Sequence, residues 1–205
     1  MPCSICKDIG HNKRTHHKYV VKGIEYYKHG HGISYYRNGQ KKYEGEWKDY
    51  KRHGHGIEYC EDGQKEYEGE WKDNSRNGHG IEYNENGQKI YEGEWEHGMS
   101  KGHGIEYYRN GQKKYEGEWQ DDERNGHGIE YNEDGSKRYE GEWKYYVPHG
   151  YGIFYHKNGK EYEGKWQYNM WDRCEFKCKK CWKTIKYVNQ NEVEHECIEQ
   201  EKERV

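Results

Sequence analysis

Cysteine and histidine residues near the N-terminus have the spacing of metal ligands. They follow one another as C-x2-C-x4-H-x4-H, at Cys3, Cys6, His11 and His16. Structural Zn²⁺ takes four such nitrogen and sulfur ligands in a tetrahedron, and a module this small folds only around its metal. The sequence therefore predicts a zinc site within residues 1–22, with His17 as an alternative to His16.

A second set of ligands lies near the C-terminus, as a C-x-x-C pair and an H-x-C pair: Cys178, Cys181, His195 and Cys197. Cys174 is an alternative ligand. Close cysteine pairs in a chain without a secretory signal or an 18-residue apolar run favour metal over disulfides. We therefore expect about two zinc ions, in an intracellular, cytoplasmic protein with no transmembrane segment.

The N-terminal motif resembles a zinc knuckle in which histidine replaces the usual fourth cysteine, and Gly10 before His11 fits that pattern. The resemblance implies contacts with single-stranded nucleic acid through Ile5, Lys13 and Arg14. These residues would combine an apolar platform with charges that neutralise phosphate. The other interpretation is a structural cap or a protein contact.

Between the two ends, one phrase repeats. The tyrosine of Y-E-G recurs in steps of 24 residues, with a last step of 23, at Tyr43, Tyr67, Tyr91, Tyr115, Tyr139 and Tyr162. A fixed period in this range indicates a stacked repeat architecture. We count six repeats, from Gly30–Trp47 to Gly150–Trp166, and a decayed first phrase at Tyr19–Lys22.

Each repeat is predicted to be a β-hairpin, because alternating residues flank an Asn-Gly or Asp-Gly turn. In repeat two, a three-residue loop at 61–63 with Gly63 left-handed would pair Ile57 with Tyr67. That register places Ile57, Tyr59, Tyr67 and Trp71 on one aromatic face.

Repeat six has lost one residue after its glycine. A two-residue loop, Asn158-Gly159, would pair Tyr155 with Tyr162 and restore the same face. The shorter loop would offset the deletion, because a slip of one residue flips every side chain.

The phrases Y-E-G-E-W, G-H-G-I and N-G at this spacing resemble the MORN repeat over residues 30–166. The resemblance implies an all-β repeat fold, an elongated open antiparallel sheet of stacked β-hairpins, without catalytic residues. With small terminal zinc modules, the predicted parts are residues 1–22 (knuckle-like module and linker), 23–166 (hairpin array) and 167–205 (zinc-ribbon-like tail). Both modules are placed to cap an edge of the sheet.

Two faces follow from this arrangement. A single sheet cannot bury both, so a protein partner or a second copy is expected on the aromatic face. The opposite face carries two glutamate columns, beginning at Glu44 and Glu46. Its negative charge disfavours an acidic membrane surface.

A histidine column beginning at His31 is expected to hydrogen-bond the loops between hairpins.

No nucleotide-binding, serine-hydrolase or zinc-protease motif occurs in the chain. The sequence therefore predicts a non-enzymatic scaffold or protein-interaction module with zinc-stabilised ends. Single-stranded nucleic-acid binding through the knuckle is the first alternative, and membrane association is the second.

Overall fold

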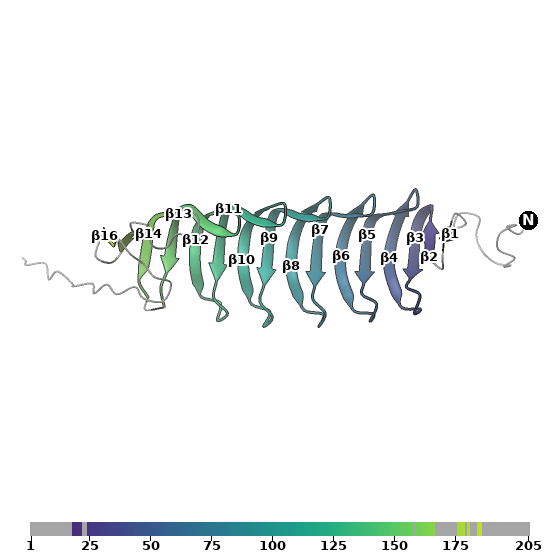
Figure 1. Ribbon diagram of the computed structural model, residues 1–205, viewed down its shortest axis with the longest axis horizontal. Coiled ribbons are helices and arrows are strands. Elements are labelled where there is room, and N and C mark those ends of the chain that lie inside the picture. Colours follow the sequence, from purple (N-terminus) through teal and green to yellow (C-terminus); the bar gives the residue numbers. More distant parts are fainter. Residues whose placement is uncertain are drawn as a thin grey trace, which may run out of the picture. The chain divides into compact units, whose positions relative to one another are not determined.

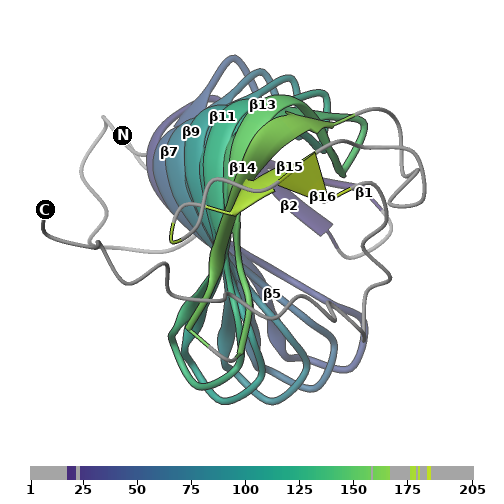
Figure 2. The ribbon, with the colours of Figure 1, turned by 90° about the vertical axis from the view of Figure 1, so that its left-hand side faces the viewer.

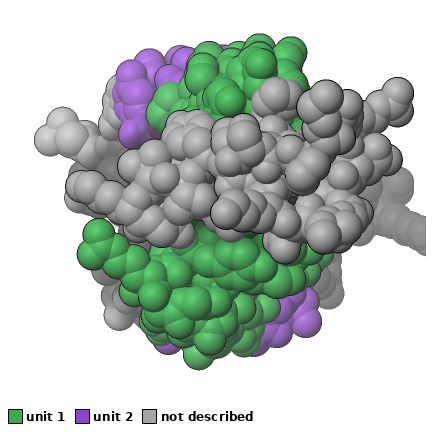
Figure 3. Space-filling model, turned by 90° about the vertical axis from the view of Figure 1, so that its right-hand side faces the viewer, with its two compact units in different colours: residues 1–100 green, residues 101–205 purple. Residues whose placement is uncertain are grey.

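The structure is a computed structural model that describes residues 18–21, 24–157, 159–166, 176–178, 180 and 184–185. It divides into two compact units, residues 1–100 and 101–205, which Figure 3 colours separately. Within the described ranges, both units consist of β-strands joined by tight turns, without a helix. The predicted all-β fold of stacked antiparallel hairpins is confirmed.

The strands of unit 1 are β1 (Lys18–Val21), β2 (Ile24–Tyr27), β3 (His29–Tyr35), β4 (Lys41–Lys48), β5 (Lys51–Tyr59), β6 (Lys65–Lys72), β7 (Ser75–Tyr83) and β8 (Lys89–Glu96). Those of unit 2 are β9 (Met99–Tyr107), which begins at the boundary, β10 (Lys113–Gln120), β11 (Glu123–Tyr131), β12 (Lys137–Lys144), β13 (Val147–Tyr155), β14 (Glu161–Trp166), β15 (Phe176–Cys178) and β16 (Thr184–Ile185). The strands β3 to β8 and β9 to β16 follow chain order within their units (Figure 1).

The turn within each hairpin is a three-residue loop. In repeat two, the N–H of Cys60 donates to the carbonyl of Gln64 (2.8 Å) and the N–H of Gly63 to the carbonyl of Cys60 (3.0 Å). Gly63 has a φ of 90°, which is the left-handed glycine of a type I turn with a bulge. The predicted loop is confirmed in the first five repeats, where the corresponding glycines are Gly39, Gly63, Gly87, Gly111 and Gly135.

Repeat six keeps the same loop, so its predicted two-residue turn is wrong. The N–H of His156 donates to the carbonyl of Lys160 and the N–H of Gly159 to the carbonyl of His156, both at 2.9 Å. Phe154, rather than Tyr155, is therefore the residue opposite Tyr162. The missing residue must be absorbed elsewhere in the hairpin.

The difference lies in a β-bulge in the second strand of repeats one to five. In repeat two, Tyr59 pairs with Lys65 but Glu58 pairs with Tyr67, so Glu66 is extra. The register of β13 and β14 has no such shift. A bulge breaks strict alternation, and Ile57 consequently pairs with Glu68 instead of Tyr67. The prediction that Ile57 and Tyr67 share a face is wrong for this reason.

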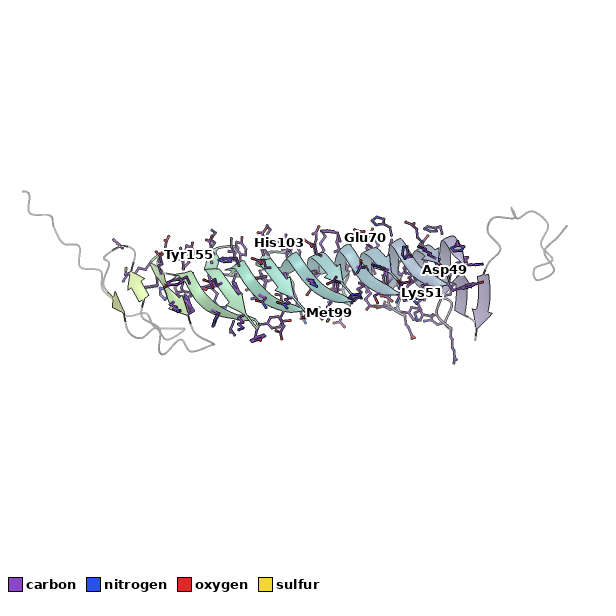
Figure 4. The ribbon with its side chains drawn as sticks, turned by 90° about the horizontal axis from the view of Figure 1, so that it is seen from above. Asp49, Lys51, Glu70, Met99, His103 and Tyr155 are labelled. Atoms are coloured by element: carbon purple, nitrogen blue, oxygen red, sulfur yellow. The ribbon has the colours of Figure 1, made fainter. Side chains whose placement is uncertain are left out.

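Successive hairpins are joined by two-residue turns. Lys48 pairs with Lys51 across Asp49 and Tyr50, whose φ values are 50° and 65°. Two left-handed residues define the type I′ turn, whose twist matches that of the strands. Figure 4 labels Asp49 and Lys51 at this turn. In the end-on view of Figure 2, the hairpin loops and these connecting turns lie at opposite ends of the bent strands.

The G-x-G motif forms a second irregularity beside each connecting turn. Gly45 pairs with Gly56 and Trp47 with Arg52, so Glu46 alone faces three residues of β5. Gly54, at the centre of these three, has a φ of 59°. The Glu46 carboxylate accepts the N–H of His55 at 3.0 Å. One glutamate column therefore satisfies main-chain donors of the bulge.

Strands from outside the repeats lie at the ends of the array. Tyr27 of β2 covers Gly32 and contacts Trp47 with ring centroids 5.8 Å apart. It takes the place that we expected for the phrase at Tyr19–Lys22. In unit 2, β15 pairs with β14, with Cys178 opposite Tyr162. The last hairpin strand is therefore not an unpaired edge, in agreement with the predicted cap.

Candidate functional site

One face of the sheet is sealed by its own aromatic rings. We call it the sealed face: the Tyr and Trp of Y-E-G-E-W, the facing glycines, and the side chains between them. Tyr67 is 0% exposed and contacts Trp71 and Trp95 edge to face, with centroids 5.2 and 5.4 Å apart. A Cβ at Gly80 would lie closer than 3.0 Å to the Tyr67 ring. The ring thus lies flat on the next hairpin, where only glycine leaves room.

The polar atoms of the Tyr67 and Trp71 rings are also satisfied. The hydroxyl of Tyr67 donates to the carbonyl of Glu70 (3.1 Å), and Nε1–H of Trp71 donates to the carbonyl of Gly56 (3.2 Å). Burial raises the pKa of Tyr67. The same contacts recur in unit 2, where Tyr139 touches Trp143 and Trp166 at 5.2 and 5.1 Å. The sealed face is a continuous core within each unit.

Arginines complete the sealed face. The guanidinium of Arg124 lies 4.6 Å from the centroid of Tyr115 and 5.3 Å from that of Trp143. It is paired with Glu106 at 2.6 Å and with Glu130 at 3.3 Å. Burial opposes ionisation of Glu106, but the charges and hydrogen bonds of Arg124 and Lys114 together outweigh it, and the pKa of this carboxyl lies below its ordinary value.

This ion-pair network was not predicted, although the sequence carries a signal for it. Arg and Glu recur six residues apart, as in Arg76 and Glu82, which are paired at 2.6 Å. In repeat six both positions change together, to Pro148 and Phe154, and Phe154 is buried against Trp166. Paired loss of both charges avoids a buried unpaired ion.

The opposite face carries three rows of side chains that run across the strands. We call it the open face. In unit 1 the His/Glu row is His31, Glu46, His55, Glu70, His79 and Glu94. The Ile/Glu row is Ile33, Glu44, Ile57, Glu68, Ile81 and Glu92. The Tyr/Lys row is Tyr35, Lys41, Tyr59, Lys65, Tyr83 and Lys89.

Unit 2 has open-face rows of the same kind. Figure 4 labels His103, a member of its His/Glu row, and Tyr155, a member of its Tyr/Lys row. The figure also labels Glu70 of unit 1.

The charges of the open face are partly neutralised. Glu44 pairs with Lys41 and Glu68 with Lys65, each at 2.7 Å. These pairs offset the acidic column that the sequence suggested. Glu46 and Glu70, in contrast, are bound only to main-chain N–H groups in the described part of unit 1. Negative charge on this face is therefore concentrated in the His/Glu row.

The open face is hollowed between its rows. In unit 1, a depression of about 430 Å³ lies between the His/Glu and Ile/Glu rows. Its walls include His31, His55 and Ile57, and its floor is the backbone of Gly45 and Gly56. The imidazoles of His31 and His55 are exposed, and it is the main-chain N–H of His55 that donates to the Glu46 carboxylate.

Most predicted zinc ligands lie outside the described residues: Cys3, Cys6, His11, His16, Cys181, His195 and Cys197. The predicted nucleic-acid contacts Ile5, Lys13 and Arg14 lie outside them as well. Cys178 is described and is 0% exposed. Within the described ranges, no three His, Cys, Asp or Glu side chains are close enough together to hold a metal ion. Among the same residues, no helix has the length and apolar character to cross a membrane.

A sheet of repeated hairpins that seals one face with its own rings and presents regular rows on the other defines the molecule as a β-hairpin repeat protein. The MORN repeat pattern matches six segments, residues 21–41, 43–65, 67–89, 91–113, 115–137 and 139–161. The chain belongs to the MORN repeat family. A comparison with curated proteins gave no match. MORN repeats are generally protein- or membrane-interaction modules, and the family is typically non-enzymatic.

Proposed function

We propose that the chain is a non-enzymatic scaffold that binds another protein through the open face. The observation that carries this is the persistence of exposed histidines. Five of the six repeats keep histidine in the His/Glu row, at His31, His55, His79, His103 and His127, and all five are exposed. At His55, His79 and His127 the main-chain N–H donates to the glutamate that faces the bulge, and the His127 imidazole lies 3.9 Å from the same Glu118 carboxylate.

Other positions of the repeat that are at least partly exposed have diverged. The residue that starts each hairpin loop is Tyr36, Cys60, Asn84, Tyr108, Asn132 or His156. The second residue of each connecting turn also changes, from Tyr50 to Asn74, Gly98, Asp122 and Tyr146. A recent duplication alone would have left these positions alike. The histidines are retained at exposed positions while the loop and turn residues vary, and this favours recognition by a partner.

The chemistry of the open face favours a protein over a membrane as that partner. An acidic lipid surface attracts Lys and Arg. The chain has a formal net charge of −3, and the lysines at Lys41 and Lys65 are already paired with glutamates. The rings left for a partner are those of the Tyr/Lys row, since Tyr43 and Trp47 are buried in the sealed face.

Site-specific photo-crosslinking in the native cell tests this function. A photoreactive residue at Tyr59, on the open face, should cross-link to a defined protein. The same residue at Tyr145, which is 57% exposed in a connecting turn, is the control. Cross-links to lipid alone, or the same products from both positions, would contradict the proposal.

We further propose that zinc organises the two ends, through the CCHH set and the Cys178 set. Cys178 supports this, because its buried position beside β14 would fix a ribbon against the last repeat. Protein purified without chelator should contain about two zinc ions by elemental analysis. A Cys3→Ser, Cys178→Ser double variant that keeps its full metal content would contradict the assignment.

A further inference from the structure

We propose that the open face of unit 1 binds a polyproline II segment of a partner protein that carries Lys or Arg at every third position. This inference rests on the proposed scaffold function and names the chemistry of its partner. Three properties of the open face point to it: the spacing of its rows, the location of its uncompensated charge, and its supply of hydrogen-bond donors.

The spacing comes from the strands. Equivalent residues, such as His31 and His55, are two strands apart, about 9.4–9.8 Å in an antiparallel sheet. Three residues of a polyproline II helix span about 9.3 Å and complete one turn. Such a segment therefore presents the same side to every repeat. An α-helix returns to the same side after seven residues, about 10.5 Å, and so drifts from the rows by about 0.7–1.1 Å per repeat, against about 0.1–0.5 Å for polyproline II.

An extended β-strand fits the rows less well. Its side chains alternate between two faces, so a residue three positions along points away from the sheet. Only a conformation with three residues per turn brings one side chain to each repeat at this spacing. Half-buried tyrosines with this period, Tyr59 and Tyr83, offer the kind of aromatic surface on which polyproline II segments dock.

The uncompensated charge selects the side chains of the ligand. Glu46 and Glu70 keep their negative charge, whereas Glu44 and Glu68 are paired with lysines. A cation at every third position would meet the His/Glu row once per repeat. The two other positions of each triplet would lie over the depression and the Ile/Glu row, which suits proline.

The hydrogen-bond donors select the backbone of the ligand. A polyproline II helix makes no internal hydrogen bonds, so its carbonyl groups are free to accept. The imidazoles of His31 and His55 are exposed beside the depression and have N–H donors, and the next histidine of the row, His79, is exposed as well. An α-helix has already used the carbonyls that face these donors. The open face therefore complements an unpaired backbone.

The row changes in the last repeat of unit 2. Tyr151 replaces the histidine and Lys165 replaces the glutamate, and the Lys165 ammonium lies 6.0 Å from the centroid of the Tyr151 ring. A cationic ligand would be repelled there. The charge in the row thus changes from negative to positive in the last repeat. This gives the His/Glu row of unit 2 a defined end, as expected of a recognition surface.

Fluorescence anisotropy with labelled peptides and the full chain tests the inference. The probe is (Pro-Pro-Arg)₃. The control is (Pro-Pro-Pro-Arg)₃, which keeps the charge and the polyproline II conformation but breaks the triplet period. We expect the triplet peptide to bind at least about tenfold more tightly. Equal binding of the two peptides, or no binding of the triplet peptide, would overturn the inference.

Matched variants locate the site. A Glu46→Gln, Glu70→Gln double variant keeps an acceptor for the bulge N–H groups but removes two charges, and should weaken triplet binding about tenfold or more. A Glu61→Gln, Glu85→Gln control removes two exposed charges from hairpin loops of the same unit. Similar losses in both variants would indicate non-specific attraction and refute the site. Circular dichroism establishes that both variants fold.

The outcome is separable from the test of scaffold function. If photo-crosslinking at Tyr59 captures a protein whose binding segment is helical or lacks the basic triplet, the scaffold function stands and the polyproline II inference fails. If the basic triplet peptide binds but Tyr59 cross-links only to lipid in the cell, the recognition chemistry stands and the proposed function fails.

Discussion

Replacing Gly80 by alanine tests how the sealed face is built. Gly80 is buried and is not left-handed, so alanine introduces no backbone strain of its own. Its Cβ, however, would occupy space held by the Tyr67 ring, within 3.0 Å of Oη, Cζ and Cε2. The nearest atoms belong to a ring held by two tryptophans rather than to a flexible chain. The ring must therefore move.

The size of the effect follows from what Tyr67 loses. Two edge-to-face contacts contribute about 0.5–1.5 kcal/mol each. Full exposure of a buried aromatic side chain of about 150–250 Å² would cost about 4–6 kcal/mol at 25 cal/mol per Å². Ordinary overpacking costs about 1–3 kcal/mol. We expect Gly80→Ala to lower the free energy of unfolding by about 3 kcal/mol, because the ring is displaced but not fully exposed.

Gly39→Ala is the matched control. Gly39 has a φ of 87°, and nothing lies within 4 Å of its Cβ position. Its replacement should cost about 1–2 kcal/mol, for the left-handed backbone alone. Both variants lower the entropy of the unfolded chain by the same Gly-to-Ala change, so that effect cancels in their comparison.

Urea unfolding, followed by tryptophan fluorescence and circular dichroism, measures both variants, and an unchanged m-value shows that the unfolding transition is comparable. A double-mutant cycle isolates the contact. In a Tyr67→Ala background, Gly80→Ala should cost less than about 0.5 kcal/mol, because the obstructing ring is gone. The reasoning is refuted if Gly80→Ala costs no more than Gly39→Ala, or if the two effects in the cycle are additive.

Three further predictions concern charge, register and the array end. Because the pKa of Glu106 lies below its ordinary value of 4.5, its contribution to stability is present above that pH and is lost as the pH falls through the folded pKa. Glu106→Gln should therefore lower the melting temperature at pH 7 but flatten its fall in acid; an unchanged acid profile would contradict this. Deleting Glu66 removes the bulge and one ion pair with Arg76. Unfolding followed by circular dichroism should show a folded chain whose free energy of unfolding is lower by about 1 kcal/mol or less. Loss of cooperative unfolding would show that the bulge is required. Removing residues 167–205 exposes β14, and light scattering should then detect concentration-dependent association; a truncated chain that stays monodisperse would show that the tail is not a cap.

The repeat, the hairpins and the loop type could be predicted from local signals. Asn-Gly or Asp-Gly between alternating segments defines a hairpin whatever lies around it. The left-handed glycine at Gly63 follows from the same rule. These features depend on the backbone preferences of a few neighbouring residues, and one repeat is enough to reveal them.

The register could not be predicted in this way, because it depends on packing between hairpins. Counting residues along both strands from the three-residue loop places Ile57 opposite Tyr67. In the structure, however, Glu66 is an extra residue that forms a bulge. The bulge keeps Tyr67 on the face where it covers Gly80 and touches Trp95. The buried ring decides the register, and the extra residue is accommodated where it disturbs this contact least.

The same packing explains why the MORN repeat boundaries differ from the hairpins that the sequence suggests. The family match runs from Tyr43 to Lys65, across a connecting turn. The ring of Tyr43 lies over Gly56 within that segment. The packed unit is therefore the second strand of one hairpin with the first strand of the next. Asn-Gly signals mark the loops within hairpins. A division of the chain at hairpins therefore splits this packed unit between two neighbouring hairpins.

Most letters of the repeated phrase have a physical role in the fold. The tyrosine and tryptophan form the sealed core, and the second glycine of G-x-G makes room for the ring. The first glycine bends the bulge, and the second glutamate of E-G-E satisfies its N–H. The histidine between the glycines supplies its main-chain N–H to the glutamate that faces the bulge, and Tyr151 can replace it there. A side chain that tyrosine can replace, repeated on an exposed face, is best explained by what the open face binds.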